Sequence, residues 1–124
     1  MSNTDALQNT LGDSHADSDL VSGVYEGGLK VWDCAFDLVD WVSANKDLIT
    51  GKRVLELGCG QGLPGVMALK AGAAKVIFQD FNVEVLDKAT KPVIEMNVEG
   101  ADSSSGSERY GLLAGTWLDL IQNE

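Results

Sequence analysis

The sequence predicts an α/β domain in which short parallel strands alternate with helices and a ligand binds beyond the carboxyl ends of the strands. A short apolar run at residues 53–57 breaks into a glycine-rich stretch, and a helical segment follows it. A second short apolar run, residues 75–79, comes after that helix. A strand, a helix and a strand in this order form a right-handed parallel unit, which sets the fold class.

Residues 1–18 are predicted to form a disordered acidic tail. They include several aspartates, no lysine or arginine, and mostly small polar residues. His15, the single histidine of the chain, lies in this tail. A catalytic base needs a fixed setting, so we interpret His15 as a bystander.

The rest of the chain, residues 19–124, is assigned to the α/β unit. Its first part, residues 19–32, mixes large apolar residues with glycines and is expected to pack against the domain. A helix is predicted from about Val31 to Asn45, because apolar residues recur along one face and three aspartates lie opposite. The apolar stripe is interpreted as core and the aspartates as a solvated face.

The glycine-rich stretch after the first strand is predicted to hold a small molecule. Gly58, Gly60 and Gly62 allow a tight turn and let a ligand approach backbone N–H groups. Pro64 suits the first turn of a helix, and Gly72 suits its C-terminal stop after about Ala71. The N-terminus of this helix directs a partial positive charge at the loop.

Two motifs overlap in this stretch. Gly60, Gly62 and Gly65 match the dinucleotide pattern G-x-G-x-x-G, which predicts a nicotinamide-dinucleotide binder. However, the strand should end at the first glycine of that pattern, whereas Gly58 already precedes it. The alternative pattern places an acidic residue, Glu56, on the strand and Gly58 after it. We favour this second pattern, in which Glu56 orients the loop or faces a cationic ligand group; a solvated strand-end charge is the alternative.

The second strand ends at Asp80, which lies 22 positions after Gly58. Parallel strands bring their carboxyl ends to one edge, so Asp80 is expected beside the glycine loop, where it can bind both ribose hydroxyls of an adenosine ligand. A role as a helix cap or turn residue is the alternative. A helix over residues 83–98, offset or kinked at Pro92, a flexible loop over residues 99–107 and a third strand over residues 109–114 complete the prediction.

Composition excludes several function classes. The net charge of −10 disfavours binding to nucleic acid and to anionic membranes. The sequence has neither an apolar run long enough to span a bilayer nor a signal peptide at its start. Cys34 and Cys59 are too few for a disulfide scaffold and have no neighbouring residues suited to a metal site, so no metal is expected. An intracellular, reducing compartment is the expectation.

These motifs resemble those of a known family. The Glu56-x-Gly58-x-Gly60-x-Gly62 pattern resembles motif I of the S-adenosylmethionine (SAM)-dependent methyltransferases. A narrower resemblance, to the protein-histidine N-methyltransferases, covers about residues 18–118. It rests on four segments: 18–32 with its Glu-Gly-Gly-Leu-Lys-Val-Trp end, 54–62, Phe-Gln-Asp-Phe-Asn at 78–82, and Gly-Thr-Trp at 115–117.

The resemblance implies a Rossmann-like class I methyltransferase fold, SAM as cofactor, and methylation of a histidine in a large-subunit ribosomal protein, in the cytoplasm or nucleus. By position, the three loop glycines would line the methionine end of SAM, with Glu56 supporting the loop, and Asp80 would bind the ribose. Asn82 is a weaker neighbour of the ribose. Trp117 would lie against the adenine or form part of the core. Lys30 and Trp32 would border the cofactor, although a Trp at a helix start is also typical of a core residue.

The sequence departs from the family in two ways. Thr116 replaces the family's acidic residue before Trp117, and the chain ends at Glu124, just after the third strand. We therefore expect the N-terminal half of the domain, with its first strand at an open edge that invites pairing with a partner chain. No residue is nominated as catalytic. A non-catalytic SAM-binding fragment, or a half domain completed by a partner, is the alternative to an enzyme.

Overall fold

The computed structural model describes residues 30–101 and 108–122. The predicted acidic tail, most of the segment that follows it and residues 102–107 of the predicted loop lie outside these ranges. The described residues contain a parallel sheet with helices between its strands, as the sequence predicts.

Within the described ranges the sheet has three strands in the order β1-β2-β3, with β1 at one edge. They are β1 (Arg53–Glu56), β2 (Lys75–Asp80) and β3 (Tyr110–Ala114), and all neighbours are parallel. Glu56 pairs with Phe78, which pairs with Leu112 on its other side. The three carboxyl ends therefore meet at one edge of the sheet, where the ligand site is expected.

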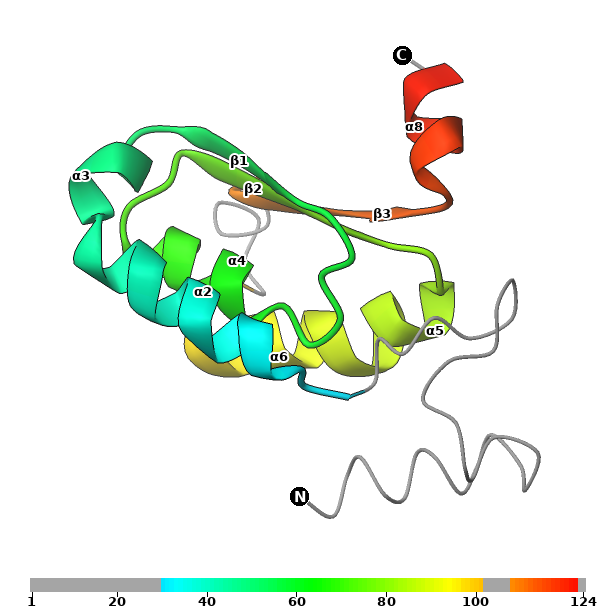
Figure 1. Cartoon of the computed structure of the whole chain (residues 1–124), viewed down its shortest axis with the longest axis horizontal. Helices are drawn as coiled ribbons and strands as arrows, with labels where there is room; N and C mark the ends of the chain where they lie inside the picture. Colours follow the sequence, from blue (N-terminus) through cyan, green and yellow to red (C-terminus); the bar gives the residue numbers. More distant parts are fainter. Residues whose placement is uncertain (1–29, 102–107, 123–124) are drawn as a thin grey trace.

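The helices of the described ranges are α2 (Asp33–Ala44), α3 (Lys46–Ile49), α4 (Leu63–Lys70), α5 (Val83–Val85), the π-helix η2 (Leu86–Thr90), α6 (Lys91–Asn97) and α8 (Trp117–Gln122). Figure 1 shows α2, α4, α5 and α6 on one face of the sheet, with α8 extending from the end of β3. The short α3 and the closing helix α8 were not predicted from the sequence.

The core lies between the sheet and the helices on this face. Val76, Phe78, Leu69 and Ile94 are almost fully buried there. The Arg109 guanidinium closes one end of this layer, because its Nη2 atom donates to the carbonyls of Leu69 at 2.9 Å and Ala73 at 3.2 Å. These carbonyls lie at and beyond the C-terminus of α4, where a cation is favourable.

The helical stretch between β2 and β3 is irregular before Pro92, as the sequence predicts. Its middle section, η2, is a π-helix that ends at Thr90, and Pro92 occupies the first turn of α6. Proline lacks an N–H, and its ring would clash with the preceding turn of a regular α-helix. The wider π-turn before Pro92 accommodates the proline within the helical stretch. The π-turn buries Thr90 completely beneath the glycine loop.

The apolar stripe of α2 is less buried than the sequence predicts. Val42 is buried, but Phe36 and Leu38 are each about half exposed. Only the C-terminal part of the stripe meets the core; the remainder borders a cavity, described below, or solvent. The opposite face of the sheet is also open among the described residues, because Leu55 of β1 and Leu57 just after it are 54% and 50% exposed.

Candidate cofactor-binding site

The glycine loop joins β1 to α4 and makes the tight turn that the sequence predicts, with three glycines in the left-handed conformation. Gly58, Gly60 and Gly62 have φ angles of +59°, +53° and +81°. Residues with a Cβ atom rarely adopt this conformation. The loop turns directly into α4, whose N-cap is Gly62 and whose first turn contains Pro64.

The glycines of this stretch serve two different purposes. A Cβ atom added at Gly58 would meet nothing within 4 Å, so this glycine borders open space. A Cβ atom at Gly65 would approach the Phe78 ring to 2.8 Å at Cζ and the Glu56 carboxylate to 2.7 Å. Gly65 therefore lets α4 pack closely on the sheet, whereas Gly58 leaves room for a ligand.

Asp80 lies beside the glycine loop, as the parallel topology predicts. Its Oδ2 atom accepts a 3.0 Å hydrogen bond from the Gly60 N–H, and Oδ1 accepts one of 3.2 Å from the Asn82 N–H. Asp80 is 4% exposed. It thus fixes the loop and the following turn, and each oxygen retains a second lone pair for a ligand hydroxyl.

Glu56 turns from β1 toward the helices and supports the loop. Its Oε1 atom accepts a 2.9 Å hydrogen bond from the Gly65 N–H in the first turn of α4. Burial raises the pKa of this carboxyl to about 7; the Gly65 N–H lowers the pKa and the charge of Asp80 raises it. The interpretation of Glu56 as a merely solvated charge is therefore wrong, because the side chain is partly buried and bonded.

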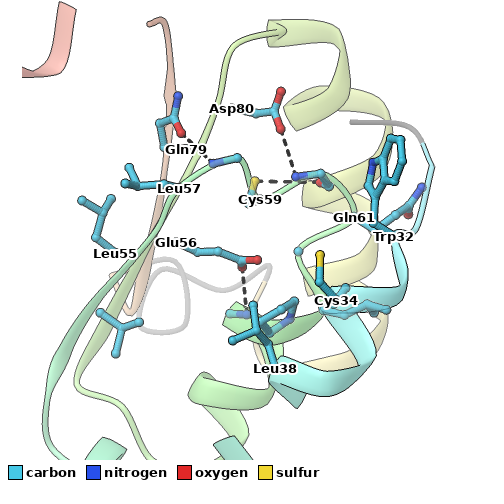
Figure 2. A pocket seen from close by; sticks show the side chains of 18 of the residues that line it. Trp32, Cys34, Leu38, Leu55, Glu56, Leu57, Cys59, Gln61, Gln79 and Asp80 are labelled. Atoms are coloured by element: carbon cyan, nitrogen blue, oxygen red, sulfur yellow. Dashed lines mark hydrogen bonds between the residues drawn. The ribbon is translucent and has the colours of Figure 1, made fainter. Parts of the chain in front are cut away.

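A cavity of about 990 Å³ adjoins the loop. Its walls come from α2 and the residues before it, the end of β1, the glycine loop, the end of β2 and the loop from β3 to α8. Figure 2 shows Glu56, Gln61 and Asp80 beside Trp32, Cys34 and Leu38 of the α2 region. The volume lies at the upper end of the range for small-molecule sites.

Eight of the nine predicted site residues line this cavity: Lys30, Trp32, Glu56, Gly58, Gly60, Gly62, Asp80 and Trp117. Asn82 does not line it; the residue is buried and precedes the first turn of α5. The Lys30 ammonium lies 4.8 Å from the centre of the Trp32 ring. Trp32 and Trp117 are 39% and 62% exposed, so neither is the core residue that the alternative interpretation requires.

Two further residues, Gln79 and Thr90, contact the loop but belong to no recognisable sequence motif. Gln79 is buried, and its side-chain amide accepts a hydrogen bond of 2.8 Å from the Gly58 N–H. The Thr90 hydroxyl donates a hydrogen bond of 2.6 Å to the Gly60 carbonyl. Gln79 is one residue of a strand, in which successive side chains point to opposite faces, and Thr90 lies within a helix. Neither residue belongs to a motif that would mark it in the sequence.

The buried thiol of Cys59 is not suited to nucleophilic chemistry. Burial raises its pKa to about 12, and a hydrogen bond with the Thr90 hydroxyl lowers it. In the described ranges no group of three or more His, Cys, Asp or Glu side chains is arranged to hold a metal ion. Nor does any helix in those ranges have the length and apolar character needed to cross a membrane.

The parallel sheet, the glycine loop after β1 and the strand-end carboxylate of Asp80 together define a class I SAM-dependent methyltransferase fold. Similar solved structures support this class. A chain of the Trypanosoma brucei PRMT1 enzyme-prozyme heterotetrameric complex with AdoHcy is 29% identical with a TM-score of 0.51, and the match covers 67% of this chain and 24% of that one.

Residues 18–117 match the family described as lysine methyltransferase, and the chain belongs to this family. Among curated proteins, it is similar to histidine protein methyltransferase 1 homologs. The Bos taurus protein is 55% identical over 64% of this chain and 21% of its own length. The Dictyostelium discoideum protein is 41% identical over 86% of this chain and 33% of its own. The resemblance inferred from the motifs is thus confirmed, and the chain spans between a fifth and a third of these relatives.

SAM is the cofactor of this class, and the residues present fit it. The open space beside Gly58 leaves room for the methionine part of SAM to lie close to the backbone of the glycine loop. The second lone pairs of the Asp80 carboxylate suit the two ribose hydroxyls. The exposed ring of Trp117 offers a flat surface of the kind on which an adenine stacks.

Proposed function

We propose that this chain supplies the SAM-binding part of a protein methyltransferase that methylates a ring nitrogen of a histidine. The observation that carries the proposal is the hydrogen bond between Gly60 and Asp80. It places the carboxylate that we propose for the ribose next to the loop that we propose for the methionine end. The acceptor type follows the names of the curated relatives, which are histidine protein methyltransferases.

In this proposal the chain acts by positioning. Bound SAM would supply a methyl group already activated by its sulfonium charge. The glycine loop would hold the methionine end, Asp80 would accept hydrogen bonds from the ribose, and Trp117 would lie against the adenine. Lys30 and Trp32 would border the cofactor from the other side. A neutral imidazole nitrogen then needs alignment with the methyl group more than activation.

The proposed substrate is a large-subunit ribosomal protein, and the proposed location is the cytoplasm or nucleus. The net charge of −10 disfavours binding to nucleic acid and to anionic membranes, and it would complement a basic protein acceptor. Transfer of a labelled methyl group from SAM to purified large-subunit proteins would test this. Loss of labelling after the acceptor histidine is replaced is expected; label on lysine would contradict the acceptor type.

Cofactor binding is tested by isothermal calorimetry of residues 1–124 with SAM, S-adenosylhomocysteine and NAD. Saturable binding of the first two and none of NAD is expected. Selective binding of NAD would instead favour the dinucleotide pattern of Gly60, Gly62 and Gly65.

A second candidate function is a half domain that a partner chain completes. The observation that favours it is the open side of the sheet: β1 lies at an edge, and the Leu55 and Leu57 side chains are about half exposed. An edge strand presents unpaired backbone N–H and C=O groups, and a strand of another chain can pair with them. Methyl transfer that appears only after a complementary chain is added would support this candidate.

A further inference from the structure

We infer that Gln79 is a positioning residue that sets the spacing between the two loops on either side of the cavity: the glycine loop after β1 and the β3–α8 loop, residues 115–116. This inference rests on the proposed function, because a ligand that contacts both loops is sensitive to their spacing. The proposed site places the methionine end of SAM at the first loop and the adenine beside Trp117, at the end of the second.

The side chain of Gln79 forms hydrogen bonds to both loops. Its Oε1 atom accepts from the Gly58 N–H at 2.8 Å and from the Trp117 indole N–H at 3.3 Å. Its Nε2 atom donates 2.8 Å to the Gly115 carbonyl. Figure 2 shows the Gln79 and Asp80 side chains directed to different sides of the strand. The Asp80 carboxylate accepts its hydrogen bond from the Gly60 N–H. Two adjacent residues of β2 thus hold the same loop from opposite sides.

The arrangement requires a glutamine amide. Gln79 is 1% exposed, and a buried amide is costly unless it is hydrogen-bonded. Two N–H groups point at Oε1 and one carbonyl faces Nε2, so the amide has one favourable orientation. A glutamate side chain would lack the donor for the Gly115 carbonyl. A methionine side chain has a similar length but would form none of the three hydrogen bonds.

Backbone hydrogen bonds also connect the end of β2 to both loops, and the side-chain amide of Gln79 adds to them. The Cys59 N–H donates 2.7 Å to the Gln79 carbonyl, and the Gly115 N–H donates 3.1 Å to the Asp80 carbonyl. These bonds do not depend on the side chain. Loss of the amide should therefore leave the loops attached to β2 while their spacing relaxes, which predicts a folded variant with a weaker cofactor site.

The test compares Gln79→Met with the control Ile77→Met by calorimetry with SAM and with adenosine. Ile77 is on the same face of β2, two residues earlier, and does not line the cavity. SAM affinity is expected to fall about tenfold or more in Gln79→Met, since several net hydrogen bonds are lost. Adenosine reaches one of the two loops, so its affinity should fall less. Ile77→Met should preserve both affinities.

A second readout follows the hydrogen bonds themselves. In ¹⁵N-labelled protein, the Trp117 indole resonance, assigned with Trp117→Phe, should shift in Gln79→Met, and the Gly58 amide should exchange faster with solvent. If Gln79→Met does not fold, Gln79→Glu takes its place. That variant keeps the acceptor for Gly58 and Trp117 but sets an oxygen against the Gly115 carbonyl, so an intermediate loss of SAM affinity is expected.

Equal losses of SAM and adenosine affinity would overturn the inference, because a purely structural role weakens both. Unchanged SAM affinity in Gln79→Met would overturn it while the proposed function stands. If the wild-type chain binds no SAM, the proposed function fails instead, and the indole and amide measurements still decide whether Gln79 holds the two loops.

Discussion

The Asp80 carboxylate accepts a 3.0 Å hydrogen bond from the backbone N–H of Gly60, which joins the end of β2 to the loop that follows β1. Twenty residues separate the two groups in the sequence, and the parallel pairing of the strands brings them together. A single carboxylate can therefore both shape the glycine loop and bind a ligand hydroxyl.

Replacing Asp80 with asparagine should weaken SAM binding more than it weakens the fold. The amide oxygen can still accept from Gly60, but the charge and one acceptor oxygen are lost. Hydrogen bonds to charged groups contribute about 1.5–3 kcal/mol, so we expect a loss of affinity of about tenfold to a hundredfold. Calorimetry measures it. Asp40→Asn, an equal charge change on the exposed side of α2, is the control; equal losses in both variants would count against a ribose role.

Gly58→Ala should damage the site while its steric effect on the fold stays small. The left-handed conformation at φ +59° costs a residue with a Cβ atom about 1–2 kcal/mol, and the added methyl group meets nothing within 4 Å. Gly51→Ala is a matched control, since Gly51 has φ +76°, has equally open surroundings and does not line the cavity.

Both glycine variants should therefore lose similar stability in urea denaturation. SAM affinity is expected to fall about tenfold or more in Gly58→Ala alone, which corresponds to about 1.4 kcal/mol. Normal binding by Gly58→Ala would show that the methionine end does not approach this part of the loop.

Gly65→Ala should lower stability because its methyl group would overlap the Phe78 ring and the Glu56 carboxylate. Alanine is favoured over glycine in a helix by about 1 kcal/mol, but overpacking a core costs about 1–3 kcal/mol, so we expect a net loss of up to about 2 kcal/mol. The free energy of unfolding in urea measures it. Phe78→Leu should relieve the clash, so the double variant should lose less than the sum of the single losses. Strict additivity would contradict this contact.

The sequence predicts the parts of this structure that follow from local pattern and parallel topology. The glycine loop, the strand-end position of Asp80 and the irregular helix before Pro92 are all found where the pattern places them. The role of Gln79 was not predictable, because it depends on how the ends of three strands converge. The burial of α2 was overestimated, since periodicity identifies an apolar face but not what covers it.

Thr116 shows how a departure from a family motif can acquire a local role. The sequence identifies it only as the residue that replaces an acidic side chain before Trp117. In the structure its hydroxyl accepts from the Asp119 N–H at 3.1 Å, and its N–H donates 2.9 Å to the Asp119 carboxylate. These reciprocal bonds form a capping box at the start of α8. The Thr116 N–H, followed by the Thr116 side chain, lowers the pKa of the Asp119 carboxyl group. The pair thus holds Trp117 at the first position of the helix.

Glu56 should make the stability of the fold depend on pH. Burial raises its pKa from 4.5 to about 7 in the folded chain, so folding favours the protonated form. Its contribution is fully present below pH 4.5 and is lost as the pH rises through about 7. Glu56→Gln keeps an oxygen for the Gly65 N–H but cannot ionise. The free energy of unfolding of the wild type, measured in urea from pH 4 to 8, should therefore decline relative to that of Glu56→Gln.

The control for this prediction is Glu95→Gln, which changes the net charge equally on the exposed side of α6. Its stability profile should run parallel to that of the wild type. In Asp80→Asn the decline should move to lower pH, because the Asp80 charge is one cause of the raised pKa of Glu56. Parallel profiles for the wild type and Glu56→Gln would contradict the prediction, because they would mean that folding leaves the pKa of Glu56 unchanged.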